Sequence, residues 1–212
     1  MSKQRIHWHC FNEVNEKYDI IDQGGFSKTA IKGQVEESLR SLKSGDIFVE
    51  IGVLCGGSLF NFYEFVSNPE VEFVGIDVWE NQTSCNGIEL ENWDEEDFKK
   101  FIKVELDCRK KVENIIKDNK FNIKLIQLES TESVYSGFDD ESIGFLHLDG
   151  NHSFESVYQD LETYYPKMKK GGMILFDDWQ WPEVREGIMK FLEDKNLNAA
   201  TDVNGLKAYI IK

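Results

Sequence analysis

The sequence lacks long hydrophobic runs, and no apolar stretch approaches the roughly 20 residues that a membrane-spanning helix requires. Its first ten residues are polar and contain no apolar stretch of the signal-peptide type. Basic residues are scarce: 24 lysines and arginines accompany 39 acidic residues, which leaves a net charge of −15. Because nucleic acids and anionic membranes bind to basic surfaces, we expect neither as a partner. These features predict a cytoplasmic protein.

Cysteine is also scarce. Four cysteines are scattered over 212 residues, with no short pair spacing of the kind that zinc sites use. We therefore expect reduced thiols rather than a disulfide framework. Repeats, low-complexity segments and interdomain linkers are absent too. The length then predicts a single globular unit, in which an N-terminal cap and helix (residues 1–44) precede the main domain (residues 45–212).

Strand-like and helix-like patterns alternate along the chain. Short apolar runs and apolar residues at helical spacing take turns up to about residue 195, and Asn204-Gly205 gives a hairpin signal after them. This order predicts an α/β fold with a mainly parallel seven-stranded sheet and a C-terminal antiparallel hairpin. We expect strands at 47–51, 72–77, 123–128, 143–148 and 173–176, a loop at 78–93, and helices at 34–43, 58–66, about 94–117, 153–168 (capped by Gly171-Gly172) and from 182 onward.

A glycine-rich turn follows the first expected strand. An acidic strand end runs into three glycines and a serine. Glycine lets the backbone turn sharply and approach a ligand, because it carries no Cβ atom. A plain strand-to-helix turn would give the same pattern, so the rest of the chain must decide. The residues concerned are Glu50, Gly52, Gly56, Gly57 and Ser58.

Acidic residues end several of the expected strands. Glu50, Asp77, Asp149 and the pair Asp177-Asp178 would lie along one edge of a parallel sheet, where such sheets bind ligands. Burying a charge is costly unless it is paired, so this recurrence favours a function over a folding role. Asp77 lies one βα unit after the glycine turn. It is placed to accept hydrogen bonds from a ribose diol, and capping of the following loop is the alternative.

The glycine turn distinguishes between two nucleoside cofactors. A dinucleotide site uses G-x-G-x-x-G to hold a pyrophosphate, whereas this turn reads Gly52-x-x-x-Gly56-Gly57. Glu50 would repel a pyrophosphate but suits a cationic amino group. Ser58 is placed to donate a hydrogen bond to a carboxylate. An amino-acid end and a ribose are what S-adenosylmethionine presents.

Two blocks of the sequence resemble known methyltransferases. Residues 50–58 resemble the first motif of class I S-adenosylmethionine-dependent methyltransferases, especially the catechol-type O-methyltransferases. Residues 145–155 (FLHLDGNHSFE) and 171–178 (GGMILFDD) resemble the small-molecule and sugar O-methyltransferases that include macrolide-sugar enzymes. The resemblance covers roughly residues 45–211. It implies a Rossmann-like three-layer sandwich, S-adenosylmethionine as cofactor and a small-molecule acceptor such as a sugar.

The same resemblance implies a metal at the carboxyl edge of the sheet. In the metal-dependent relatives, the positions of Asp149, Asp177 and Asp178 hold Mg²⁺. Independently of the resemblance, three convergent carboxylates with no thiolate or clustered imidazole favour Mg²⁺ or another hard divalent cation. The alternative is structural: Asp178 would cap the next helix and Asp149 would close a tight turn.

His152 is the first candidate for the general base, because a histidine pKa lies near neutrality. It follows Asp149 by three residues, where catechol-type relatives carry a basic lysine. By analogy with the sugar enzymes, Asp149 is the rival base. His147 lies inside a strand and is expected to be a core histidine.

Further residues are candidates for contacts to the cofactor or the acceptor. Glu129 and Ser130 follow the third strand, where relatives contact adenine. The Trp79 ring would either stack on adenine or pack in the core. Trp179 and Trp181 flank the acidic pair, where they would wall an acceptor pocket or serve packing.

Together these residues predict a divalent-metal-dependent O-methyltransferase acting on a small hydroxylated acceptor such as a sugar. A nicotinamide-dependent oxidoreductase is the enzymatic alternative. A catalytically silent cofactor-binding module is the alternative from another class. The sequence leaves the oligomeric state open, a homodimer included.

Overall fold

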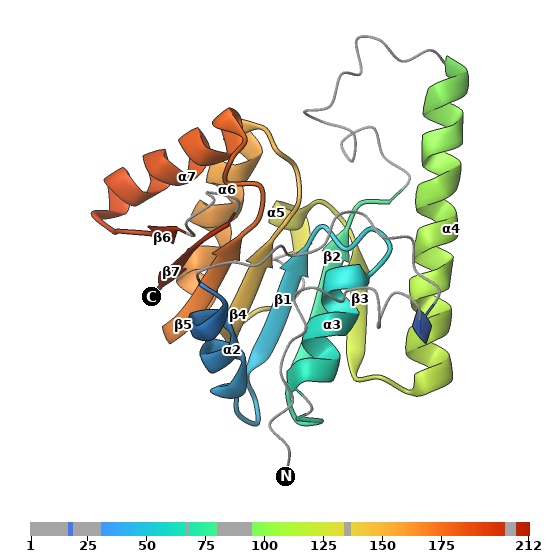
Figure 1. Ribbon diagram of the computed structural model, residues 1–212, viewed down its shortest axis with the longest axis horizontal. Helices are drawn as coiled ribbons and strands as arrows, with labels where there is room; N and C mark the ends of the chain where they lie inside the picture. Colours follow the sequence, from blue (N-terminus) through green and yellow to red (C-terminus); the bar gives the residue numbers. More distant parts are fainter. Residues whose placement is uncertain (1–16, 19–30, 67, 80–94, 134–136, 202–206) are drawn as a thin grey trace.

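The computed structural model describes residues 17–18, 31–66, 68–79, 95–133, 137–201 and 207–212 (Figure 1). Most of the expected N-terminal cap, most of the loop at 78–93 and the Asn204-Gly205 turn lie outside these residues. Among the described residues, no helix combines the length and the apolar character that crossing a membrane requires.

The described residues form one seven-stranded sheet with the strand order β3-β2-β1-β4-β5-β7-β6. Strands β1 to β5 pair in parallel, whereas β7 runs antiparallel to both β5 and β6. The expected mainly parallel sheet with an antiparallel end is therefore confirmed. The strands are β1 (Ile47–Ile51), β2 (Glu72–Asp77), β3 (Ile123–Gln127), β4 (Ile143–Leu148), β5 (Met168–Phe176), β6 (Ala200–Thr201) and β7 (Ala208–Ile211).

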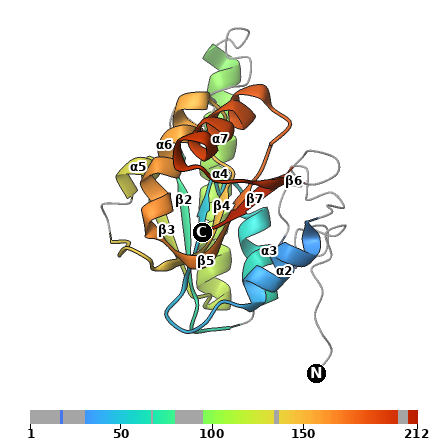
Figure 2. The same cartoon turned by 90° about the vertical axis from the view of Figure 1, so that its left-hand side faces the viewer.

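Helices cover both faces of this sheet, which gives three layers (Figures 1 and 2). Helices α2, α3 and α4 cover one face, and α6 and α7 cover the other. Each face has its own apolar core, because successive strand residues point to opposite faces. The helices are α2 (Lys32–Arg40), α3 (Gly57–Val66), α4 (Glu95–Asn119), the short α5 (Ser130–Ser133), α6 (Phe154–Tyr164) and α7 (Pro182–Lys195).

Strand β1 shows how the sequence builds both faces at once. Phe48 stacks between Phe73 of β2 and Phe145 of β4, at ring distances of 4.4 and 5.3 Å, on the side of α3. The next residue, Val49, points into the core under α6 and α7. Strand order reverses at β1, between β2 and β4, so the carboxyl end of β1 opens at the crevice where such sheets bind ligands.

The boundary between α6 and β5 differs from the expectation. The helix ends at Tyr164, a 3₁₀ turn spans Tyr165–Lys167, and β5 begins at Met168, so the expected helix at 153–168 was too long. Gly171 and Gly172 lie inside the strand and do not cap the helix. The Gly171 amide donates to the Lys212 carbonyl at 2.8 Å, and the Lys212 amide donates to the Gly172 carbonyl at 3.0 Å. Pairing with the distant end of β7 therefore extends β5.

The expectation of reduced thiols is wrong for two of the cysteines. Cys55, in the turn after β1, and Cys108, on α4, form a disulfide with a Cα–Cα distance of 4.6 Å. Both residues are buried in the core beneath α3 and α4. They lie 53 residues apart in sequence, so pair spacing alone had no means of revealing the bond. Cys10 and Cys85 lie outside the described residues.

Candidate active site

The glycine turn after β1 has a backbone that only glycine accommodates at its first position. Gly52 has a φ of +87°, and a Cβ atom there would lie 1.9 Å from the carbonyl oxygen of Asp149. The Gly52 amide donates to the carbonyl of Ile76 at 2.9 Å. Gly56 also has a positive φ, of +79°. The turn is thus pressed against the end of β4, and the two predicted halves of the site touch through their backbones.

Asp77 holds the glycine turn in place. Its Oδ2 atom accepts hydrogen bonds from the amides of Val53 and Leu54, at 2.9 and 2.8 Å. Its Oδ1 atom accepts from the amide of Trp79 at 2.9 Å. Burial raises the pKa of Asp77, and the hydrogen bonds from these amides partly oppose the rise. The carboxylate therefore serves the loop-capping role that the sequence left open, and the ribose contact stays a prediction.

Trp79 packs in the core beneath the turn. Only 1% of the residue is exposed, and its indole Nε1 donates to the Leu54 carbonyl at 3.0 Å. The Arg109 guanidinium lies 5.9 Å from the ring centre. Of the two roles considered for this side chain, the geometry matches core packing.

Glu50 is fully buried next to the turn. Its Oε1 atom accepts a hydrogen bond from the Ser58 hydroxyl and lies 3.2 Å from Nδ1 of His147. Its Oε2 atom has no hydrogen-bond partner among the described residues. A buried carboxylate oxygen without a partner is costly, and a cationic amino group would satisfy it. The Ser58 hydroxyl donates to Glu50, whereas the sequence led us to expect that it donates to the carboxylate of a ligand.

His147 connects Glu50 to the end of β5. Register pairs Glu50 with His147 across β1 and β4, and the imidazole is completely buried against the Phe62 ring. Its Nε2 atom lies 3.9 Å from Oδ2 of Asp177. The histidine is buried in strand β4, as the sequence predicts, and its imidazole links two acidic strand ends.

Asp149, His152 and Asp178 converge at the carboxyl edge. Each offers one ligand atom, and these atoms all lie within 4.8 Å of one another. The Nε2 atom of His152 lies 3.1 Å from Oδ2 of Asp178. The Trp181 ring packs on the His152 imidazole, with ring centres 4.9 Å apart, whereas Trp179 packs at the edge of the core under α7.

Asp177 faces a different partner. Its Oδ2 atom forms an ion pair with Nζ of Lys207, which is only 4% exposed, and its Oδ1 atom accepts from the Asp178 amide at 2.8 Å. Asp177 is absent from the groups of ligand atoms that converge within the described residues. Sequence reasoning missed Lys207, whose only signal was a lysine directly before the final apolar strand.

The carboxylates at this edge influence each other's ionisation. Burial raises the pKa of Asp149 well above its usual range, and the negative charge of Asp177 adds to the effect. Burial also acts to raise the pKa of Asp178, but the hydrogen bond and charge of His152, the hydrogen bond from Gln180 and the charge of Lys207 together outweigh it, and the net shift is downward. A bound cation would relieve the repulsion at Asp149. Two carboxylates and one imidazole fit a divalent metal ion.

A second group of convergent ligand atoms lies deeper. Glu50, His147 and Asp149 also bring one ligand atom each to within 4.8 Å of the others. Asp149 therefore belongs to both groups and stands between the glycine turn and the outer carboxylates.

The predicted adenine contacts lie at the start of α5. The Ser130 hydroxyl donates to Asp160 of α6, and the Ser130 carbonyl accepts from the Tyr164 hydroxyl at 2.7 Å. The Glu129 carbonyl accepts from the amides of Glu132 and Ser133, both at 3.0 Å. The two Ser130 contacts dock α5 onto α6, whereas the hydrogen bonds to Glu129 close the first turn of α5, and the adenine assignment stays a prediction.

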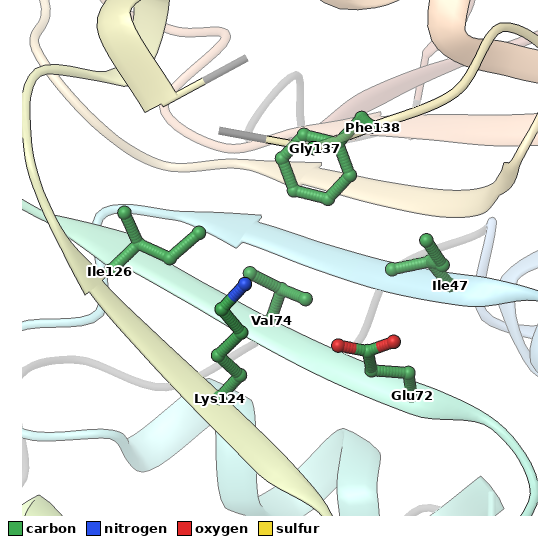
Figure 3. Close-up of a pocket in the computed structure, with 7 residues that line it drawn as sticks. All are labelled: Ile47, Glu72, Val74, Lys124, Ile126, Gly137 and Phe138. Carbon is green, nitrogen blue, oxygen red and sulfur yellow. The ribbon is translucent and has the colours of Figure 1, made fainter. Parts of the chain in front are cut away.

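A hollow elsewhere on the sheet lies away from this chemistry. Phe138 and Gly137 lie over the first halves of β1, β2 and β3, where Glu72 and Lys124 flank Val74 (Figure 3). The strand residues that line the hollow, which are Ile47, Glu72, Val74, Lys124 and Ile126, all precede the carboxyl ends of their strands, so the hollow lies away from the edge that carries Asp149. We therefore place the candidate site at the carboxyl edge.

Comparison with known families identifies the domain. A family model described as "Methyltransferase domain" matches residues 49–179. An uncharacterized protein of Acanthamoeba polyphaga mimivirus is 39% identical over 56 residues, which are 24% of this chain and 25% of that protein. A protein of Sinorhizobium fredii, y4gI, is 35% identical over 63 residues, 30% of this chain and 6% of that protein. The matches thus cover a quarter or less of these curated relatives.

Solved structures share the fold at low sequence identity. The O-methyltransferase NovP has a TM-score of 0.62 at 13% identity, over 85% of this chain and 78% of its own. The calicheamicin methyltransferase CalS11 scores 0.57 at 18% identity, over 86% and 77%. MycE from the mycinamycin pathway, in complex with Mg and SAH, scores 0.56 at 16% identity, over 95% of this chain and 54% of its own.

The family match spans more than half of the chain and includes the glycine turn, Asp77, Asp149 and the Asp177-Asp178 pair. The fold is shared with the solved methyltransferases. The chain therefore belongs to the class I S-adenosylmethionine-dependent methyltransferases.

Proposed function

We propose that this methyltransferase acts on a hydroxyl group of a small acceptor, assisted by a divalent cation. The observation that carries the proposal is the convergence of Asp149, His152 and Asp178 next to the glycine turn. Carboxylates that converge so closely repel one another, which disfavours folding, so a bound cation or a role in proton transfer would account for them.

The cofactor half of the site lies at the glycine turn. Glu50 Oε2, buried and without a partner among the described residues, suits the amino group of S-adenosylmethionine. Gly52, Gly56 and Gly57 give the backbone access, and Asp77 keeps the turn shaped while offering oxygens to a ribose. Glu129 and Ser130 are the proposed neighbours of the adenine.

The chemical half of the site lies at Asp149 and His152. Asp149, His152 and Asp178 would hold the cation, Mg²⁺ or a similar ion, which would lower the pKa of an acceptor hydroxyl. The methyl donor carries its own leaving group, so the protein's tasks are to orient the hydroxyl and to accept its proton. His152 takes that proton if its imidazole stays off the ion; if His152 coordinates the ion, Asp149 takes the proton on its second carboxylate oxygen. Asp178 orients the imidazole of His152 through the 3.1 Å contact.

A sugar is the acceptor class that we favour. CalS11 is named as a TDP-rhamnose 3'-O-methyltransferase, and MycE was solved with Mg, SAH and mycinamycin VI. The fold likeness to these proteins and the sequence blocks at 145–155 and 171–178 support the same class here. Trp181, which packs on His152, would form one wall of the acceptor pocket.

A methyl-transfer assay tests the proposal. The assay presents S-adenosylmethionine with sugars, catechols and other phenols, with and without Mg²⁺. Asp178→Ala should lower metal-stimulated transfer by about 100-fold, because it removes a metal ligand and the partner of His152. Cofactor affinity, measured by calorimetry, should change little. Asp140→Ala, on an exposed acid that pairs with Lys167, is the matched control.

Two results would contradict the proposal. If Asp178→Ala weakened cofactor binding as much as transfer, the two halves of the site would not be separate. Tight binding of NAD in place of S-adenosylmethionine would point instead to an oxidoreductase.

A further inference from the structure

Lys207 occupies a carboxylate that the sequence assigns to the metal. Its ammonium group pairs with Oδ2 of Asp177, and the amide of Asp178 donates to the other oxygen of the same carboxylate. Both oxygens of Asp177 therefore have protein partners. Asp149 and Asp178 keep oxygens that converge with the His152 imidazole.

The strand register fixes Lys207 in this position. Phe176 of β5 pairs with Ala208 of β7 in the antiparallel ladder. The next residue pair in that register brings Asp177 opposite Lys207. Lys207 is 4% exposed, so its ammonium is held among protein groups and cannot exchange freely into water. The ion pair is thus built by the backbone and is not a chance surface contact.

The surrounding charges make a resident cation favourable. Glu50, Asp149 and Asp178 lie with Asp177 at the same sheet edge, and the positive charge of Lys207 acts on Asp149 as well as on Asp177. A buried carboxylate without a counter-charge is strongly unfavourable. A lysine at residue 207 therefore stabilises the carboxylates in the absence of any metal ion.

We propose that Lys207 is a fixed cation that withdraws Asp177 from metal binding, so that the protein's metal ligands are Asp149, His152 and Asp178. The inference rests on the proposed function, since both put a divalent cation at this edge. It adds that Lys207 lowers the affinity of the site for the metal ion. Removing its ammonium group should release the Asp177 carboxylate as a further ligand.

Binding of Mn²⁺ alone, without cofactor or acceptor, tests the proposal by calorimetry on the full chain. Lys207→Met should tighten Mn²⁺ binding by about 10-fold, because Asp177 becomes a ligand and a positive charge is lost. Lys207→Arg keeps the charge and should retain the affinity of the unmodified chain. Lys212→Met, on a lysine at the other end of β7 that donates to backbone carbonyls, is the control for a lost positive charge.

A double-mutant cycle separates release of Asp177 from a simple charge effect. Most of the gain from Lys207→Met should disappear in the Asp177→Asn background, because no carboxylate is then left to release and only the effect of the lost positive charge remains. An equal gain in both backgrounds would overturn the proposal, since charge alone would explain it. A loss of about 100-fold from Asp177→Asn alone would also overturn it, because Asp177 would then already be a ligand.

The same titrations distinguish this inference from the proposed function. If the unmodified chain fails to bind Mn²⁺ but Lys207→Met binds it, the withdrawal of Asp177 by Lys207 stands, whereas the site of Asp149, His152 and Asp178 and the metal dependence of transfer fall. If no variant binds Mn²⁺, both fall. Should Lys207→Met fail to fold, as judged by circular dichroism, Asp177→Asn and Lys207→Arg carry the test with the outcomes given above.

Discussion

Gly52 is the residue at which the cofactor turn and the end of β4 meet. Its positive φ and its contact with the Asp149 carbonyl are separate reasons for glycine. Gly45 provides a comparison, because its φ of +84° is similar but a Cβ atom there would have no neighbour within 4 Å. Comparing Gly45 with Gly52 therefore separates the cost of a positive φ from the cost of steric overlap with the Asp149 carbonyl.

Alanine substitution at these two glycines should give unequal losses of stability. Gly45→Ala should cost about 1 kcal/mol, the price of a left-handed conformation. Gly52→Ala should cost about 3 kcal/mol or more, because the Cβ atom also displaces the end of β4. Urea unfolding measures both. Equal costs would show that the Asp149 contact relaxes freely.

Asp160 makes stability depend on pH. It lies on α6 with 3% exposure, and burial raises its pKa to about 7 despite the hydrogen bond from Ser130. The unfolded chain has the ordinary, lower pKa, so the folded state binds more protons between about pH 4 and pH 7. The contribution of Asp160 to stability therefore falls as the pH rises through this window.

Asp160→Asn should remove this dependence. At pH 8 the variant should be more stable than the unmodified chain by about 4 kcal/mol at most, and near pH 4 the two should be similar. The asparagine can still accept the hydrogen bond from Ser130. Urea unfolding at pH 4.5 and at pH 8, run on both proteins, measures the difference. If the variant and the unmodified chain differed in stability by the same amount at both pH values, ionisation of Asp160 would not be the source of the difference.

A disulfide joins the glycine turn to helix α4. It fastens a 25-residue helix to the segment that carries the cofactor turn. A cross-link of this kind stabilises a protein mainly by restricting the unfolded chain. Helix α4 also contributes Val112 and Ile115 to the same core, so apolar packing supports the attachment.

Reduction of Cys55–Cys108 should lower the free energy of unfolding by about 2–4 kcal/mol. Thermal unfolding with and without a dithiol reductant measures the effect. The double variant Cys55→Ala with Cys108→Ala is the control, and its unfolding temperature should not respond to the reductant. If the unmodified chain were equally unresponsive, the disulfide would contribute nothing to stability.

Local patterns predicted most elements, and they failed where a distant partner decides. The helical spacing of Val157, Leu161 and Tyr164 continues to Met168 by coincidence, which lengthened the expected helix. A Gly-Gly pair commonly ends a helix. Here Gly172 sits where a Cβ atom would lie 3.0 Å from the Gly144 carbonyl, so glycine permits close approach of two strands.

At the scale of the whole molecule, the sheet edge was predictable because it follows from chain order. Strands that alternate with helices run parallel, so their acidic ends had to gather at one edge. The pairing partners within that edge were not predictable. Lys207 reaches Asp177 through the register of β7, and Cys55 reaches Cys108 through the docking of α4. Both depend on three-dimensional packing that no local spacing encodes.

The position of β7 has a consequence for the order in which the protein is made. This strand lies between β5 and β6 in the sheet, yet the ribosome synthesises it after both. Strands β1 to β5 can therefore pair while Lys207 is still missing from the nascent fold. During that interval Asp177 lacks the ammonium group of Lys207, and the carboxylates at this edge repel one another. We expect this edge to be the last part of the sheet to fold, when β7 pairs with β5 and brings Lys207 to Asp177.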